Sequence, residues 1–179
     1  MNFKKPDDSE IILTELMLPS HSNFSGKIHG GFILSLMDKA AFASALKFSS
    51  QYCVTASVNR VDFLNAIEVG ELVTMRAKVN YVGNSSMVVG IRVESQNIRT
   101  GVVKHCNSSY FSMVAKDETG KTVKVPGLII SNLNDMRRFL RSIKHINMRN
   151  ERKMEFSKNT FEPEKYKEAL NGYNVKLEL

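Results

Sequence analysis

The fold of this chain is decided by one stretch, Gly30-Gly31-Phe32-Ile33-Leu34-Ser35-Leu36-Met37-Asp38-Lys39-Ala40-Ala41-Phe42-Ala43-Ser44-Ala45-Leu46-Lys47. At helical spacing this stretch is apolar on nearly every face. A helix that is hydrophobic all round lies inside a fold rather than on its surface. We therefore predict a long buried helix from Gly30 to about Phe48, which the rest of the chain must enclose.

Asp38 is the one acid within this predicted helix. It lies about two turns in, too deep to cap the helix or to neutralise the positive end of its dipole. Its neighbours at three and four residues are Leu34, Ser35, Ala41 and Phe42, so no lysine or arginine pairs with it along the helix. An isolated carboxylate in an apolar interior is costly and persists when it is paired or functional. Either the Asp38 carboxylate pairs with a basic residue from elsewhere or reaches the edge of a cleft, or it has a catalytic role.

The loop before the helix has the composition of an active-site loop. Residues 18–31 combine turn formers and small polar side chains, and Gly30 and Gly31 open the helix. Backbone N–H groups at a helix start have no partner within the helix, and glycines let a ligand approach them, which suits an anion or an oxyanion. Asn23 adds an amide that can hold a carbonyl or a water. Loop, helix start and acid together favour acyl transfer or hydrolysis.

Extended segments surround the helix in the sequence. We expect a first strand at 10–18, and after the helix four strands at about 53–64, 71–82, 86–98 and 103–115, with a short return at 122–125. The segment 71–82 alternates apolar and polar residues, as a half-buried antiparallel strand does. Short turns between strands favour an antiparallel meander. The predicted fold is α+β, a curved antiparallel sheet wrapped around one long helix.

The composition changes after Pro126-Gly127. Apolar residues at helical spacing predict a helix from Asn134 to about Met148, and Pro163 suits the start of a second short helix. Residues 129–179 carry a net charge of +4 out of the +7 of the whole chain. This basic face is either solvated or attracts an anionic partner. We divide the chain into a core domain, 10–127, and a basic, partly helical extension, 128–179.

The sequence gives little support for a metal site, a serine hydrolase site or a nucleic-acid-binding motif. Cys53 and Cys106 lack metal spacing, and no apolar segment suits a secretory signal or a membrane span, so we expect free thiols in a reducing cytoplasm. The histidines show no ligand spacing, which predicts no metal. The elbow of a serine hydrolase, Gly-x-Ser-x-Gly, does not occur, and neither does a helix-turn-helix pattern for nucleic acid.

Six separated pieces of the chain carry a resemblance to a known family. They are Leu18 to Asn23, His29-Gly30-Gly31-Phe32, Leu36-Met37-Asp38, Val61-Asp62-Phe63-Leu64, Val82-Gly83-Asn84-Ser85-Ser86, and Asp117 to Lys121 before Val125-Pro126. In this order and spacing the chain resembles a hotdog-fold acyl-CoA thioesterase of the bacterial and cytosolic acyl-CoA hydrolase branch. The resemblance covers residues 10–127 and implies the hotdog fold.

The resemblance also implies roles for individual residues. Asp38 would be the general base or the nucleophile, Asn23 would act on the same substrate across a dimer interface, and the N–H of Gly31 would polarise the thioester oxygen. Substrate contacts would come from His29, Gly30, Gly83, Asn84, Ser85 and Ser86. No separate cofactor is implied, since coenzyme A is part of the substrate. The implied assembly is a homodimer, or a trimer of dimers.

The phosphates of coenzyme A favour basic partners. We consider Arg60, Arg92, Lys104 and the tail arginines Arg137, Arg138 and Arg141 as candidates for this contact. Two alternative functions remain. A hotdog dehydratase would use His29 and Asp38 as its acid and base, and a non-catalytic acyl-CoA sensor would bind the same ligand without a competent base.

Overall fold

The computed structural model describes residues 2–158 and 173–176. Residues up to Lys144 form one compact unit, and those from His145 onward form a second. The first unit contains the long helix α1 (Gly30–Ser49), the sheet and the first turns of α2 (Leu133–Lys158). It therefore continues past the predicted domain end at residue 127. The predicted helix at Pro163 lies outside the described residues.

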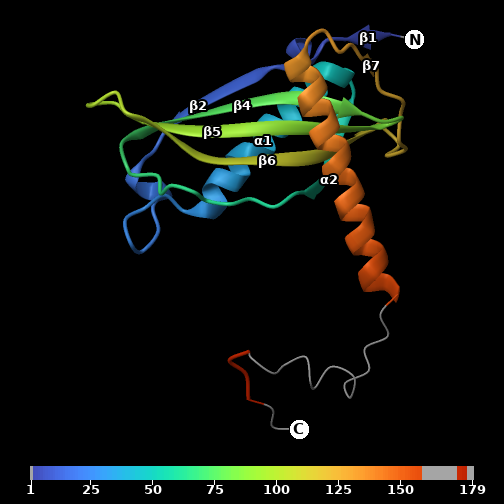
Figure 1. The fold of residues 1–179 in the computed structure, drawn as a ribbon. Coiled ribbons are helices and arrows are strands. Elements are labelled where there is room, and N and C mark those ends of the chain that lie inside the picture. The colour runs from blue at the N-terminus through green and yellow to red at the C-terminus, as the bar shows by residue number, and fades with distance from the viewer. Residues whose placement is uncertain (1, 159–172, 177–179) are drawn as a thin grey trace. The chain divides into compact units, whose positions relative to one another are not determined.

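The main sheet has five antiparallel strands in the order β2-β4-β5-β6-β3 (Figure 1). Their bounds are β2 Ile11–Leu16, β4 Glu71–Val82, β5 Ser86–Asn97, β6 Val103–Lys116 and β3 Tyr52–Val58. Only β4, β5 and β6 follow one another as a meander. The strand β3 pairs with β6 rather than with β4, because the long connection 59–70 carries the chain across the sheet. This places β3 and β2 at the two edges.

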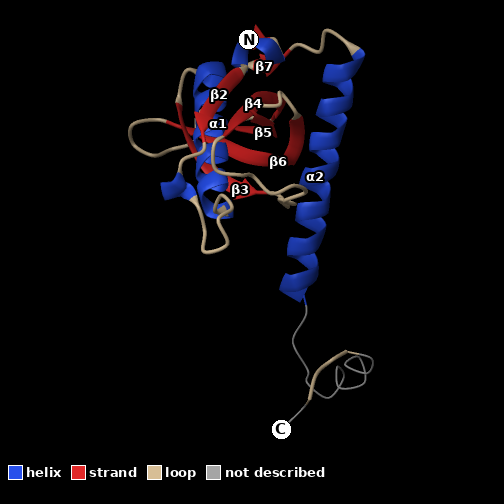
Figure 2. Cartoon of the chain, turned by 90° about the vertical axis from the view of Figure 1, so that its left-hand side faces the viewer, coloured by secondary structure: helices blue, strands red, loops and turns tan. Residues whose placement is uncertain are grey.

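The core lies between α1 and one face of the sheet. Alternate residues of β4 and β5 point to α1, and the register brings Met75 opposite Val93 and Val79 opposite Val89. These side chains are fully buried. The sheet curves around α1, with the first turns of α2 on its other face (Figure 2). The predicted fold, a curved antiparallel sheet around a long helix, is thus confirmed.

Four smaller elements complete the described structure, apart from α1 and α2. Strand β1 (Phe3–Lys4) pairs in parallel with β7 (Gly127–Leu128), and two 3-10 turns lie at Pro6–Ser9 and Pro19–His21. Within the described part of the chain, neither helix has the length and hydropathy that crossing a bilayer requires.

Two predicted strands differ from the structure. The strand predicted to reach residue 64 ends at Val58, because the chain then leaves the ladder and contacts β6 through single bonds such as Leu64 N–H to the carbonyl of Cys106, 2.9 Å. The predicted strand at 122–125 is wrong. Only one bridge, Lys116 to Thr122, forms there, and the backbone N–H of Val125 instead bonds the carbonyl of Asn84 in the β4–β5 turn.

Candidate active site

Asp38 lies on the exposed side of α1, beside the edge strand β3. The residues of α1 that pack on the sheet, among them Met37 and Ala41, are fully buried, whereas Asp38 is exposed in the single chain. The prediction of a buried Asp38 is therefore wrong at the level of one subunit. The reason is geometric: one side of a helix faces the sheet, and the composition of α1 does not reveal which residues occupy that side.

Thr55 holds the Asp38 carboxylate. Its hydroxyl donates a hydrogen bond to Asp38 Oδ1 across 2.6 Å. Thr55 is on β3, at the free edge of the sheet, and the register pairs it with Met113 of β6. Sequence reasoning missed this residue, because a threonine in a strand is common and the two positions are 17 residues apart in different elements.

In the part of the chain that the structure describes, no basic side chain neutralises Asp38. Among the described residues, none of the ion pairs involves it, and Oδ2 makes no hydrogen bond. A carboxylate that is oriented through one oxygen and open at the other can accept a proton from water or attack an electrophile. The arrangement supplies an oriented base without a counter-ion.

The start of α1 is capped by its own histidine. Nδ1 of His29 accepts a hydrogen bond from the backbone N–H of Gly31, 2.9 Å, and a side chain at residue 31 would collide with the imidazole ring. The N–H predicted to polarise the thioester oxygen is thus occupied by His29 in the single chain. A substrate oxygen can take its place only if the exposed His29 ring turns aside. Phe63 packs directly over Gly30, so a Cβ there would approach its ring to 3.2 Å.

Asn23 organises the loop that precedes the helix. Its Oδ1 accepts bonds from the backbone N–H groups of Ser25 and Lys27, at 3.0 and 3.1 Å, and from the Ser25 hydroxyl, 2.8 Å. These bonds form an Asx-type turn and leave the amide Nδ2 of Asn23 exposed and available as a donor. Within one chain no hydrogen bond joins Asn23 to Asp38.

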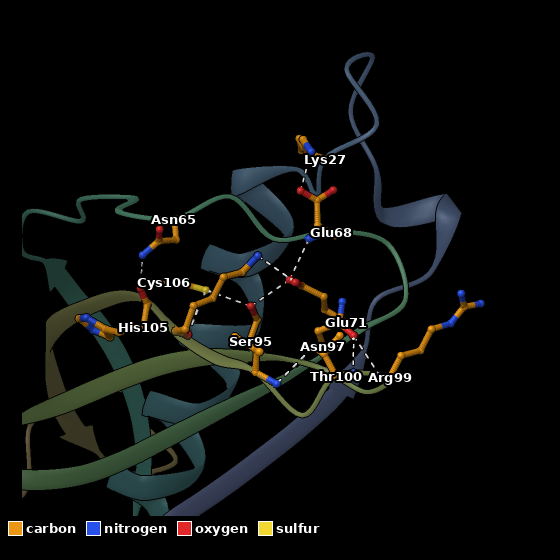
Figure 3. Close-up of polar contacts among 12 residues, drawn as sticks. Lys27, Asn65, Glu68, Glu71, Ser95, Asn97, Arg99, Thr100, His105 and Cys106 are labelled. Carbon is orange, nitrogen blue, oxygen red and sulfur yellow. Dashed lines mark hydrogen bonds and ion pairs between the residues drawn. The ribbon is translucent and has the colours of Figure 1, made fainter.

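A buried acid anchors the base of this loop (Figure 3). The Glu71 carboxylate accepts bonds from the backbone N–H of Glu68, 3.0 Å, and from the Ser95 hydroxyl, 2.9 Å, and pairs with Lys104 at 2.8 Å. Burial raises the pKa of Glu71, but the Glu68 N–H, Lys104 and Ser95 together outweigh it and hold that pKa below its ordinary value.

The anchored segment reaches the loop directly. Glu68 pairs with Lys27 at 2.5 Å, and the backbone N–H of Ile28 donates to the carbonyl of Ile67. The network around Glu71 therefore fixes the position of residues 67–71, and these hold the end of the Asn23 loop against the sheet.

The structure separates the predicted substrate contacts. The turn Gly83-Asn84-Ser85-Ser86 closes the β4–β5 hairpin with a bond from the N–H of Gly83 to the carbonyl of Ser86, 2.8 Å. Arg60 is exposed and paired with Asp62, and Lys104 is committed to Glu71. Arg92, Arg137, Arg138 and Arg141 gather instead on the outer face of the sheet.

The two cysteines are buried free thiols, as predicted. Burial raises the pKa of Cys53, and this effect outweighs the hydrogen bond from Ser49 that lowers it. A buried thiol of raised pKa is a poor nucleophile. The acid on α1 is therefore the better candidate for the reacting group.

Comparison with known proteins agrees with this geometry. Residues 25–102 match the family model "Thioesterase superfamily". Protein VdlD of Helicobacter pylori is 38% identical over 143 residues, which cover 80% of this chain and 82% of that protein. A crystal structure described as an apo-hexameric acyl-CoA thioesterase has a TM-score of 0.82 and 32% identity, covering 85% of this chain and 97% of the other.

A third relative, an acyl-CoA hydrolase from Staphylococcus aureus, was solved with butyryl coenzyme A and coenzyme A. It is 26% identical with a TM-score of 0.80, covering 87% of this chain and 94% of the other. The same enzyme has been solved with an asparagine, an aspartate or a threonine replaced by alanine. We conclude that the chain belongs to the thioesterase superfamily, in its family of hotdog-fold acyl-CoA thioesterases.

Proposed function

We propose that this protein hydrolyses acyl-CoA thioesters to coenzyme A and a carboxylic acid, with Asp38 as the general base or nucleophile. The observation that carries the proposal is the Asp38–Thr55 pair, a carboxylate oriented by a 2.6 Å hydrogen bond, open to solvent and, within the described residues, without a cationic partner. In thioester hydrolysis a water attacks the carbonyl carbon, the base accepts its proton, and the tetrahedral intermediate expels the thiolate of coenzyme A.

The start of α1 would stabilise the negative charge on the carbonyl oxygen. Backbone N–H groups at a helix start are aligned with the positive end of its dipole, and one such donor contributes on the order of 3 kcal/mol to an oxyanion. The N–H of Gly31 is the candidate. It becomes available when His29 releases it, so binding of the thioester oxygen would displace the imidazole.

The site would be completed by a second subunit. The exposed face of α1 carries Asp38 beside half-buried Leu34 and Phe42, and β3 offers an unpaired sheet edge with Tyr52 exposed. A second copy that pairs along β3 and covers this face would bring its own Asn23 loop toward Asp38. The relatives described as hexameric support an oligomer for this chain.

The alanine variants of the Staphylococcus aureus relative support these residue roles. Its replaced asparagine and aspartate are 15 residues apart, and its aspartate and threonine are 17 apart. Asn23, Asp38 and Thr55 have the same identities at the same spacing in this chain. Three residues chosen for replacement in a relative thus have the same identities and spacing as the three residues proposed for this site.

The first experiment follows free thiol release from a series of acyl-CoAs of increasing chain length. We expect turnover that grows with protein concentration and differs between chain lengths. A folded protein that binds acyl-CoA without releasing thiol would instead be the non-catalytic sensor, and the proposed hydrolysis would be wrong.

The second experiment tests the shared site with mixed dimers. A dimer of one Asn23→Ala chain and one Asp38→Ala chain keeps one intact site if Asn23 acts across the interface, so about half the activity should remain. The control dimer pairs a wild-type chain with a chain that carries both changes. It should be inactive under the same hypothesis, and the opposite pattern would place both residues in one subunit's site.

A further inference from the structure

A hollow of about 310 Å³ lies on the side of the sheet opposite to α1. Its lining residues come mainly from β4, β5 and β6 and from the first turns of α2. Figure 2 shows the first turns of α2 beside the face of the sheet opposite to α1. The alternation along β4 explains why the hollow and the core lie on opposite faces of the sheet. Ala77 and Val79 face the core, whereas Arg76, Lys78 and Asn80 face outward. This hollow is therefore not part of the Asp38 site of the same chain.

The lining of the hollow is strongly basic. It contains six cationic side chains and one acidic residue, Glu10. Lys78 pairs with Asp7, and Arg92 pairs with Glu94. Within the described ranges, no ion pair involves the remaining arginines of the sheet and of α2, which are Arg76, Arg137, Arg138 and Arg141. Of these, Arg137 donates a hydrogen bond to Asn134 Oδ1, 2.7 Å. Lys78 lowers the pKa of Asp7 through its hydrogen bond and its charge, and the charge of Arg138 adds to this effect. A concentration of guanidinium groups with few carboxylate partners in one concave site attracts an anion.

Asn80 adds a second, independent sign of a ligand. It is the bulged residue of β4 between Val79 and Tyr81, its side chain is only 6% exposed, and its Oδ1 has no hydrogen-bond partner. The amide lies on Gly90, where any Cβ would collide with Asn80 Nδ2. A buried amide with an unpaired polar atom costs free energy unless a ligand or water satisfies it. Since a phosphate oxygen only accepts hydrogen bonds, the Nδ2 end of the amide is the one that would contact it, and a half-turn of the amide exchanges the two ends.

We propose that this hollow binds a small phosphate-bearing anion. Arginine presents a planar set of donors that matches phosphate oxygens in pairs, and the buried Asn80 amide supplies one further polar contact at the floor. The volume is at the low end for small-molecule sites, which suits a diphosphate or part of a nucleotide. The phosphates have two sources, a free phosphorylated metabolite or the phosphorylated nucleotide end of a coenzyme A.

The test measures binding of pyrophosphate and of adenosine 3′,5′-bisphosphate by titration calorimetry to the full-length oligomer. The variant Arg138→Gln/Arg141→Gln should weaken binding of the matching probe by on the order of tenfold or more, since each arginine–phosphate contact is a charged hydrogen bond. Arg99→Gln is the matched control. Arg99 is an exposed arginine of the β5–β6 turn outside the hollow, and its loss should leave the affinity within about twofold.

Asn80→Ala gives a second reading that does not change the net charge. It should weaken the same probe while the thermal unfolding temperature shows that the protein remains folded. Tight binding of pyrophosphate alone identifies a free phosphate ligand, and tight binding of the bisphosphate that acyl-CoA displaces identifies a coenzyme A end. The proposal is wrong if neither probe binds the oligomer, as would happen if another subunit covered the hollow. It is also wrong if Arg138→Gln/Arg141→Gln and Asn80→Ala both bind the probe as tightly as Arg99→Gln does.

Discussion

Asp38 and Glu71 are both acids set among apolar neighbours, yet the fold leaves one open and encloses the other. Glu71 is 5% exposed and has three partners, namely the Glu68 N–H, Ser95 and Lys104. Asp38 is exposed and has one, the hydroxyl of Thr55. An acid whose acceptors are all satisfied stabilises the fold, whereas an acid with a free oxygen can act on a substrate. The difference separates the structural acid from the catalytic candidate.

The largest expected effect is the loss of catalytic rate when Asp38 is replaced. Asp38→Asn keeps the shape and the hydrogen bond from Thr55 but removes the base, so kcat should fall by about 10²–10⁴-fold. The free energy of unfolding should stay within about 0.5 kcal/mol, since an exposed side chain is replaced by an isosteric one. Thiol release and urea unfolding measure the two quantities. Near-normal turnover in a folded protein would contradict the assigned role.

The enclosed acid should show the reverse behaviour. Glu71→Ala leaves Lys104 without its partner in a partly buried site and should lower the free energy of unfolding by about 3 kcal/mol. Below the unfolding temperature, kcat should change far less than in Asp38→Asn. Glu118→Ala, at an exposed hairpin, is the control. Equal stability of the two variants would show that the Glu71 network does not hold this end of the sheet.

Thr55 sharpens the comparison, because it is the one hydrogen-bond partner of Asp38 among the residues that the structure describes. Thr55→Val removes the hydroxyl and keeps the shape, and we expect kcat to fall by roughly tenfold, the value of one hydrogen bond to a charged group. Thr55→Ser should restore most of this loss, since it returns the donor. A purely structural threonine would give no such rescue, and Thr74→Val, on β4, is the control for a strand threonine.

The smallest effect concerns pH. The pKa of Glu71 is held below its value in the unfolded chain, so its contribution to stability is complete above the unfolded pKa and is lost as the pH falls through the lowered folded pKa. One such group changes the free energy of unfolding by at most about 1.4 kcal/mol per pH unit. Urea titrations below pH 5 should show a shallower pH dependence in Glu71→Gln. If the free energy of unfolding of Glu71→Gln falls with pH as steeply as that of the wild type, other groups cause the loss of stability in acid.

Local pattern was sufficient for much of the fold. The double glycine and the apolar run predicted α1 to within one residue, and the alternation of 71–82 predicted β4 at its observed bounds. These features depend on backbone freedom and side-chain period, which short segments carry by themselves. The order of the pieces around the helix was also enough to identify the family.

Contacts between distant segments decided the rest. That Asp38 is open, that Thr55 orients it and that His29 occupies the Gly31 N–H depend on how α1 packs on β3 and on its own first turn. The arginines of α2 could not be placed from the sequence either. They come close to Arg76 and Asn80 only because α2 packs on the outer face of the sheet. The sequence by itself determined the long helix, the strands of the meander and the family, since these are encoded locally. Only the tertiary structure decided which polar groups are enclosed and which remain free to bind, since that depends on packing between segments far apart in the chain.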